Sequence, residues 1–122
     1  MNYFLVFIGG GLGSITRFFL SKYFATTPDS FPLATFLANT ISSFILGLLL
    51  GYLFHKQISN DNIRLLIATG FCGGFSTFST FSYETFALFS SGNIKMGMAT
   101  VFANLLFCYL AVAAGFLISK WF

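Results

Sequence analysis

Four long runs of apolar residues, separated by three short polar segments, make up almost the whole chain. They lie near residues 3–24, 33–55, 63–89 and 96–122, and each is long enough for a helix to cross a bilayer, which takes about 20 residues. The runs are too long and too uniformly apolar for barrel strands, and lipid excludes open sheets. The pattern therefore predicts an all-α membrane protein in which residues 1–122 form a single domain of four transmembrane helices.

Composition supports a membrane location and argues against several other classes of protein. The chain is 57% hydrophobic and 7% charged, against about 25% charged residues in an average soluble domain. Its net charge of +3 is small and dispersed, which argues against a nucleic-acid partner. Because the chain has one histidine, no paired carboxylates and no serine beside a base, we expect no enzymatic activity.

Small residues recur four positions apart within the apolar runs. The pairs are Gly9/Gly13, Gly47/Gly51, Gly70/Gly74 and Ala111/Gly115. In lipid, such pairs let two helix backbones approach closely. The glycines lack the strand and the spacing of a phosphate-binding loop. We therefore interpret them as sites of close helix packing.

Two of the runs carry polar residues at helical spacing. One face of the second run holds Thr35, Asn39, Ser42 and Ser43, and one face of the fourth holds Thr100, Asn104 and Cys108. An asparagine buried in lipid is unfavourable by a few kcal/mol unless it is hydrogen-bonded. Asn39 and Asn104 therefore either bond to a neighbouring helix or donate an amide hydrogen to an anion in transit, and the pattern leaves both interpretations open.

The third run contains an unusual repeat of phenylalanine and hydroxyl residues. Residues 70–81 read GFCGGFSTFSTF, with rings at Phe75, Phe78 and Phe81. The pair Gly73–Gly74 makes a broken helix plausible, and a break would free backbone carbonyls that a cation can occupy. The electropositive edges of phenyl rings can favour an anion. The motif predicts an ion pathway, although an aromatic packing stripe remains the alternative.

Two charged residues fall inside the predicted spans. Intramembrane charges are candidate functional residues. Arg17 either draws anions into a vestibule or extends its side chain to the interface. Glu84 either faces the polar stripe near hydroxyls such as Thr35 or pairs with a cation near the interface.

Positive charge is almost balanced between the two ends of the predicted bundle. If both termini lie on one side, that side carries Lys56, Arg64 and Lys120, and the other carries Lys22 and Lys95. Lys/Arg asymmetry sets the orientation of membrane proteins, so this chain could insert in both directions. Dual insertion would make an antiparallel homodimer the natural assembly, whereas the alternative is a weak bias carried by few charges.

In order along the chain, these motifs resemble the Fluc/CrcB family of fluoride channels. The matching residues are Gly9–Ser14 with Arg17, Thr35 with Asn39, and above all the run from Gly70 to Phe81. The resemblance covers essentially the whole chain. It implies four helices per subunit with a broken third helix, an antiparallel dual-topology homodimer, two fluoride pores lined by both subunits, and a structural sodium ion at the dimer centre.

The resemblance also implies roles for individual residues. The implied pore residues are Phe78 and Phe81 by their ring edges, Asn39, the hydroxyl residues Ser79 and Thr80, the polar residues Thr35 and Glu84, the fourth-helix residues Thr100 and Asn104, and Arg17 near the vestibule. Backbone carbonyls of Gly73 and Ser76 would hold the sodium. Ser76 replaces a common threonine, which a carbonyl ligand should tolerate. Cys108 replaces a more typical serine, which weakens the expectation of a pore role there.

The expected function is passive export of fluoride down its gradient, across the inner (plasma) membrane of the cell, which protects the cytoplasm. One alternative is a small proton-coupled multidrug or cation exporter of dual topology. Such a protein needs a membrane carboxylate, and Glu84 is the candidate. A second alternative is an assembly subunit that transports nothing.

Overall fold

The computed structural model describes all 122 residues, and each regular element is helical. The elements are α1 (Asn2–Tyr23), α2 (Leu33–His55), α3 (Asp61–Ile63), the π-helical η1 (Arg64–Cys72), α4 (Gly73–Phe75), α5 (Phe78–Ser90), α6 (Ile94–Ile118) and the short 3₁₀ turn η2 (Ser119–Trp121). Four helical stretches are long and apolar enough to cross a membrane: Asn2–Tyr23, Leu33–His55, Asp61–Ser90 and Ile94–Trp121. The prediction of an all-α chain with four such helices is confirmed.

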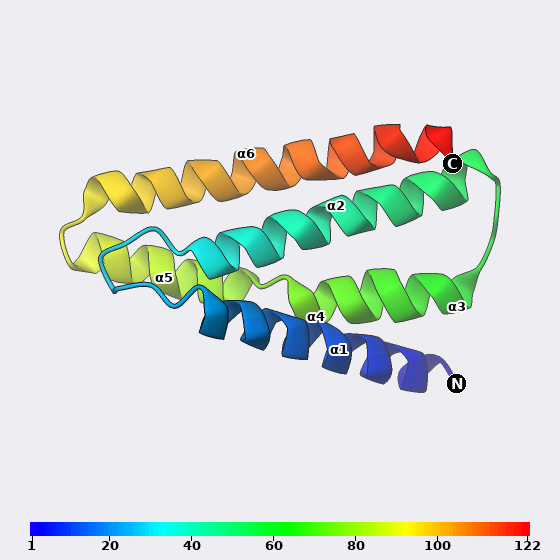
Figure 1. The fold of residues 1–122 in the computed structure, drawn as a ribbon, viewed down its shortest axis with the longest axis horizontal. Coiled ribbons are helices and arrows are strands. Elements are labelled where there is room, and N and C mark those ends of the chain that lie inside the picture. Colours follow the sequence, from blue (N-terminus) through cyan, green and yellow to red (C-terminus); the bar gives the residue numbers. More distant parts are fainter.

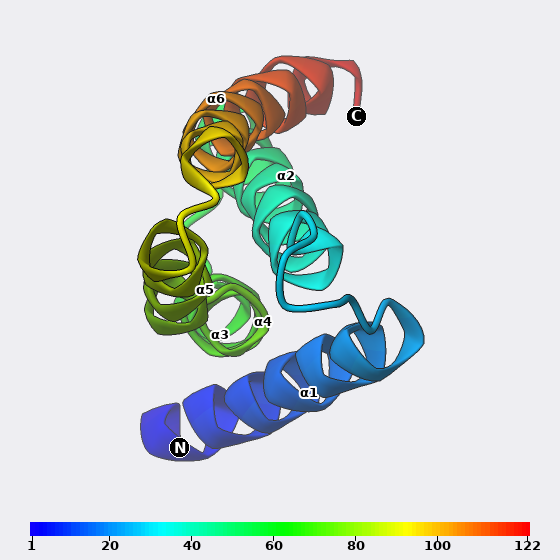
Figure 2. The ribbon, with the colours of Figure 1, turned by 90° about the vertical axis from the view of Figure 1, so that its left-hand side faces the viewer.

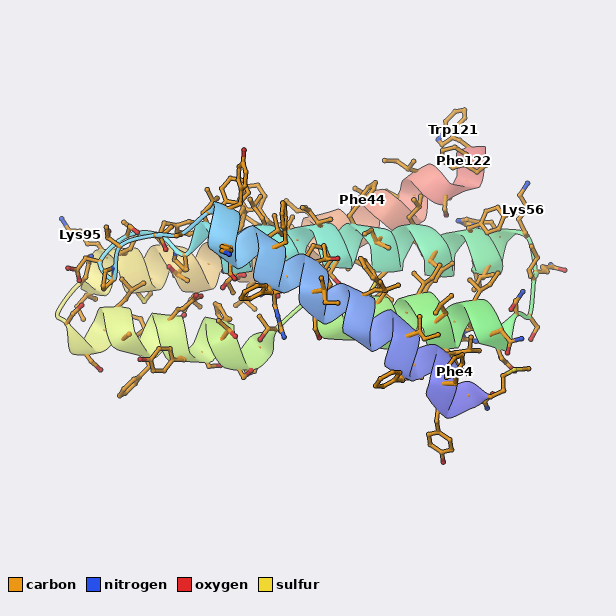
Figure 3. The ribbon with its side chains drawn as sticks, turned by 60° about the horizontal axis from the view of Figure 1, so that its bottom comes forward. Phe4, Phe44, Lys56, Lys95, Trp121 and Phe122 are labelled. Carbon is orange, nitrogen blue, oxygen red and sulfur yellow. The ribbon has the colours of Figure 1, made fainter.

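The four stretches lie roughly along one axis, with both chain termini at the same end (Figure 1). The helix α2 packs most extensively along α6, while α1 lies against η1 and α4. Viewed along the bundle, α1 and α6 lie on opposite sides, with α2 and the divided third span between them (Figure 2). Lys56 lies at the same end of the bundle as Phe4 and Trp121, which are close to the two chain termini. Lys95 lies at the opposite end (Figure 3).

The glycines of the predicted small-residue pairs lie where two helix backbones approach closely, which confirms that interpretation. A Cβ atom added at Gly9 would overlap the carbonyl oxygen of Leu66, and one at Gly13 would overlap that of Phe71. On the other side of the bundle, a Cβ at Gly47 would overlap the carbonyl oxygen of Val112. Backbone-to-backbone contact of this kind holds α1 against the third span and α2 against α6, because van der Waals packing replaces the hydrophobic drive that lipid removes.

Gly13→Ala is expected to destabilise the protein strongly. The added methyl would meet the backbone of η1 and α4, and overpacking of this kind is unfavourable by about 1–3 kcal/mol or more. We expect the melting temperature of the detergent-solubilised protein to fall by on the order of 10 °C. Gly11→Ala is the matched control, because no atom lies within 4 Å of a Cβ there. Equal melting temperatures for the two variants would contradict the packing argument.

The third span is divided by two extended residues. The helix α4 ends at Phe75, Ser76 has ψ of 159°, Thr77 has φ of −153° and ψ of 122°, and α5 begins at Phe78. We call Ser76–Thr77 the extended link; it is visible between α4 and α5 (Figure 1). The expected position, Gly73–Gly74, is helical instead, and Gly74 packs against the backbone of Gly10.

Candidate ion pathway

Thr77 ends the extended link and starts the helix that follows. Its hydroxyl oxygen accepts a hydrogen bond from the backbone N–H of Thr80 at 3.2 Å, so Thr77 is the N-cap of α5. The same hydroxyl donates to the Thr80 hydroxyl at 3.1 Å and lies 3.3 Å from that of Ser79. Thr77 is only 7% exposed. The hydroxyl residues of the repeat therefore form a local cluster at the start of α5.

Asn39 holds the link from α2 through both backbone groups of one residue. Its Oδ1 accepts from the N–H of Thr77 at 2.7 Å, and its Nδ2 donates to the carbonyl oxygen of Thr77 at 3.2 Å. A residue in extended conformation directs its own N–H and C=O to the same side, as in an antiparallel ladder. The amide of Asn39 is thus complementary to an extended Thr77 and not to a helical one.

The amide of Asn39 also reaches α6. Its Nδ2 donates to Oδ1 of Asn104 at 3.2 Å, and Nδ2 of Asn104 donates to the carbonyl oxygen of Thr100 at 3.1 Å. The interhelical bond that the polar stripes predict is therefore present, and it connects α2, α6 and the extended link. Asn104 is 4% exposed.

The end of the preceding helix is secured by hydroxyls and by Arg17. The carbonyl oxygen of Cys72 accepts from the hydroxyls of Ser42 at 3.0 Å and Ser76 at 2.8 Å, and from the backbone N–H of Ser76 at 3.0 Å. Arg17 donates from a guanidinium nitrogen to the carbonyl oxygen of Ser76 at 3.2 Å. Arg17 thus points into the bundle and does not extend to the interface.

A cavity of about 270 Å³ opens beside the extended link. We call it the phenyl cavity, and it is lined by Asn39, Ser43, Ser76, Thr77, Phe78, Phe81, Asn104, Leu105 and Cys108. The rings of Phe78 and Phe81 lie with their centroids 5.7 Å apart and their planes at 47°. Phe75, the first ring of the repeat, packs instead in the core near Phe71. The lining combines two rings, hydroxyls and two amides, and includes no basic side chain.

A second cavity of about 320 Å³ lies nearer the end that carries the loop after α1. We call it the charged cavity, and it is lined by Ser14, Arg17, Phe18, Ser21, Phe24, Ala25, Thr26, Ala34, Thr35, Thr80 and Glu84. Arg17 and Glu84 thus share one cavity with the hydroxyls of Thr35 and Thr80. One carboxylate oxygen of Glu84, Oε2, is buried without a hydrogen-bond partner.

The predicted site residues fall into three groups. The phenyl cavity brings together Asn39, Ser76, Phe78, Phe81 and Asn104, and the charged cavity brings together Arg17, Thr35, Thr80 and Glu84. Ser79, Thr100 and Gly73 border neither cavity. Thr100 is fully buried and donates its hydroxyl to the carbonyl oxygen of Met96 in its own helix. Gly73 is exposed, and no atom lies within 4 Å of a Cβ there.

The site predictions omitted Thr77, Ser42 and Ser43. Thr77 precedes a helix and is of a type favoured at N-caps, but the repeated Ser-Thr pairs offer several equivalent cap positions. The sequence places Ser42 and Ser43 on the polar face of α2 but does not indicate a role for either. Their roles depend on which neighbour each hydroxyl meets, and that is a property of the packed bundle.

Comparisons with known proteins agree on one family. The family described as "CrcB-like protein, Camphor Resistance (CrcB)" matches residues 4–116. A protein of Pyrococcus abyssi named "Fluoride-specific ion channel FluC" is 46% identical over 116 residues, 95% of this chain and 94% of that protein. Proteins of the same name from Azobacteroides pseudotrichonymphae and Escherichia coli are 38% and 42% identical, over 98% and 91% of this chain and 96% and 87% of the respective relative.

Proposed function

Because the chain belongs to the CrcB family, we propose that the phenyl cavity and the charged cavity form parts of one pathway for fluoride. The chain is a fluoride-specific ion channel and not an enzyme. The observation that carries the proposed pathway is the phenyl cavity, which two phenyl rings, two amides and several hydroxyls line between the helices that can span a membrane.

The chemistry of the phenyl cavity suits a small, strongly hydrated anion. A conducting site must replace water well enough to admit the ion and bind weakly enough to release it. The edges of Phe78 and Phe81 supply partial positive charge without a fixed cation. Arg17 lies in the charged cavity, where it can attract anions without trapping them in the phenyl cavity.

The assembly that we propose is an antiparallel homodimer with two pores, each lined by both subunits. Phe78 is 77% exposed in one chain, and Gly73, Ser79 and Thr80 are exposed beside it. Polar groups exposed at membrane depth are unfavourable, so a second copy would cover them. Lys56 and Lys95 at opposite ends of the bundle support insertion in either direction (Figure 3).

A cysteine at position 73 tests this assembly. In a background with Cys72→Ala and Cys108→Ser, we expect Gly73→Cys to form a covalent dimer with an oxidant or a short bifunctional thiol reagent, because a two-fold axis would bring the two copies of residue 73 together. Ser90→Cys is the control: it lies at the membrane end of α5, so antiparallel subunits would hold its two copies at opposite faces. Efficient coupling through Ser90→Cys alone would instead indicate a parallel dimer.

Backbone carbonyls at the extended link fit the proposed sodium ion. The N–H of Thr77 donates to Asn39, which leaves the carbonyl oxygen of Gly73 without its α-helical partner. Unwound carbonyls of this kind coordinate sodium in other membrane proteins. The carbonyl oxygen of Ser76 already accepts from Arg17, but it keeps a second lone pair. Gly73 and Ser76 would supply two ligands per chain, so the ion would need a second subunit; it would stabilise the assembly.

We place the channel in the inner (plasma) membrane, where passive flow of fluoride down its gradient would remove the ion from the cytoplasm and confer fluoride resistance. The four apolar helices and the family membership support a multi-pass membrane protein.

Fluoride efflux from liposomes that contain the purified protein tests the function. We expect fluoride to leave loaded vesicles when a potassium ionophore balances the charge, at a rate that an imposed proton gradient does not drive. The comparisons do not favour the proton-coupled exporter, and Glu84→Gln separates the two mechanisms. In a channel, the variant should retain fluoride flux that needs no proton gradient. Transport of organic cations driven by pH, and lost in Glu84→Gln, would overturn the channel mechanism.

A further inference from the structure

We propose that an apolar groove on α2 binds one acyl chain of an anionic phospholipid, and that Lys56 holds the headgroup of that lipid at the end of the helix. The groove has a volume of about 360 Å³ and is lined by Ile45, Leu48, Leu49 and Tyr52 of α2, Ile67 of η1, and Phe122. We call it the outer groove. The inference goes beyond the proposed pathway, because it does not depend on which ion the protein conducts.

The lining of the outer groove suits a hydrocarbon chain. All six side chains are aliphatic or aromatic, and the volume falls within the range of about 300–1,000 Å³ that is typical of ligand pockets. Ile45, Leu48 and Leu49 are partly buried, so the groove is set into the bundle and is not a row of fully exposed side chains. Inside a bilayer, the molecule that meets such a groove is a lipid.

The groove has the depth of one leaflet of a bilayer. Ile45 lies near the middle of α2 (Leu33–His55), and Tyr52 lies about one turn before its end. An α-helix rises about 1.5 Å per residue, so the stretch from Ile45 to His55 covers about 15 Å. That length is about half of a hydrocarbon core of about 30 Å. A single acyl chain that enters from one membrane surface would therefore fill the groove.

The groove faces away from the phenyl cavity, beside which we place the second subunit. Successive residues of an α-helix are about 100° apart around its axis. Ser43 therefore lies about 40° from Asn39, and both line the phenyl cavity. Ile45 and Tyr52 lie about 120–140° from Asn39 in the opposite direction. The outer groove is thus on nearly the opposite face of α2, where lipid and not a second copy would cover it.

The charge at the end of the groove selects an anionic headgroup. Lys56 follows Tyr52 by four residues, which places the two side chains next to each other along the same face. Tyrosine is typical of the membrane interface, where lysine extends its ammonium group to the headgroups. Lys56 and Phe122 lie at the same end of the bundle (Figure 3). The other charged side chains of this end are Arg64, Lys120 and Asp61, so cations outnumber the one acid.

A bound acyl chain would join α2 to the third span. The helix η1 packs less extensively on α2 than on α1, and the outer groove lies between α2 and η1. Filling it adds van der Waals contacts that an empty groove lacks. We therefore expect the lipid to stabilise the folded protein, since a ligand that binds only the folded state raises its stability.

Lipid binding to the purified, detergent-solubilised protein tests the inference. Native mass spectrometry would compare dioleoyl phosphatidylglycerol, which is anionic, with dioleoyl phosphatidylcholine, which has the same chains and no net charge. We expect binding of the anionic lipid to be at least about fivefold tighter, the effect of one lysine near a membrane surface. The melting temperature should rise by on the order of 5 °C when that lipid is well above its dissociation constant.

Two variants separate the headgroup contact from the groove. Lys56→Gln should remove most of the preference for the anionic lipid, whereas Lys95→Gln, the same change at the opposite end of the bundle (Figure 3), should keep it. Leu49→Trp should weaken binding of both lipids by on the order of tenfold, because the indole fills the groove. Leu12→Trp, at a residue of α1 that is 55% exposed and outside the groove, should bind both lipids normally.

Several results would overturn the inference. Equal affinity for the two lipids, or the same preference in Lys56→Gln and Lys95→Gln, would remove the headgroup contact. Displacement of the bound lipid by inorganic phosphate would show that the groove contributes nothing. A smaller assembly in Leu49→Trp, but not in Leu12→Trp, would identify the groove as a contact between subunits. None of these measurements involves fluoride flux, so a failure of the proposed function would be recognised separately.

Discussion

Phe81→Ile is expected to lower fluoride flux by on the order of tenfold or more while the protein remains folded and assembled. Isoleucine is apolar and fills most of the space of the ring, but it has no quadrupole and so offers no electropositive edge. Each tenfold loss corresponds to about 1.4 kcal/mol of barrier, a reasonable value for one ring-edge contact in a site with little water. Phe78→Ile should behave similarly, because both rings line the phenyl cavity.

The measurement compares initial fluoride efflux from vesicles at equal protein density, with the elution volume of the solubilised protein as a test of assembly. Phe86→Ile is the control: the same change on the same helix, at a residue that is 68% exposed and borders neither cavity. Normal throughput in both Phe78→Ile and Phe81→Ile would remove the ring edges from the mechanism.

The four spans and their contacts were predictable because they depend on local pattern. A run of apolar residues long enough for a bilayer has few alternatives to a helix. Likewise, a pair such as Gly9/Gly13 favours close approach of a second helix backbone. In the structure, the backbones of Leu66 and Phe71 lie against these two glycines. These features needed no knowledge of which helix lies beside which.

The position of the extended link was not predictable in the same way. Gly73–Gly74 has the weaker helix propensity, yet it stays helical and the chain extends at Ser76–Thr77. The choice depends on Asn39, 38 positions earlier, which pairs with both backbone groups of Thr77. The repeat itself cannot identify a partner so distant in sequence. Each Ser-Thr pair of the repeat is an equally good candidate for pairing with Asn39.

Arg17 illustrates how packing selects between two interpretations that the sequence leaves open. Its place within a span allowed either an interfacial or an inward side chain, and the guanidinium reaches the carbonyl oxygen of Ser76 at 3.2 Å. The close contact of α1 with α4 makes this possible, since Gly13 brings the two backbones together one turn before Arg17. The packing of Gly13 against α4 therefore places the positive charge of Arg17 beside the extended link.

Asn39→Asp should nearly abolish fluoride flux. Asn39 lines the phenyl cavity, so a carboxylate there would lie about 5 Å from an anion in transit, and two like charges at that distance repel by about 3 kcal/mol at an effective dielectric of about 20. That repulsion alone slows passage by on the order of a hundredfold. The variant also removes the Nδ2 donor, so the carbonyl oxygen of Thr77 and Oδ1 of Asn104 would both face a negative charge.

The matched control for this variant is Asn62→Asp. It makes the same chemical change at an exposed residue of α3, outside both cavities. We expect its fluoride efflux to stay within about twofold of the unmodified protein, because charges in water are screened over about 10 Å. If Asn39→Asp conducted as well as Asn62→Asp, Asn39 would lie off the ion's path and the phenyl cavity would no longer account for conduction. The charge at position 39 is therefore a more demanding test of the pathway than any removal of a side chain, because it leaves the size of the cavity almost unchanged.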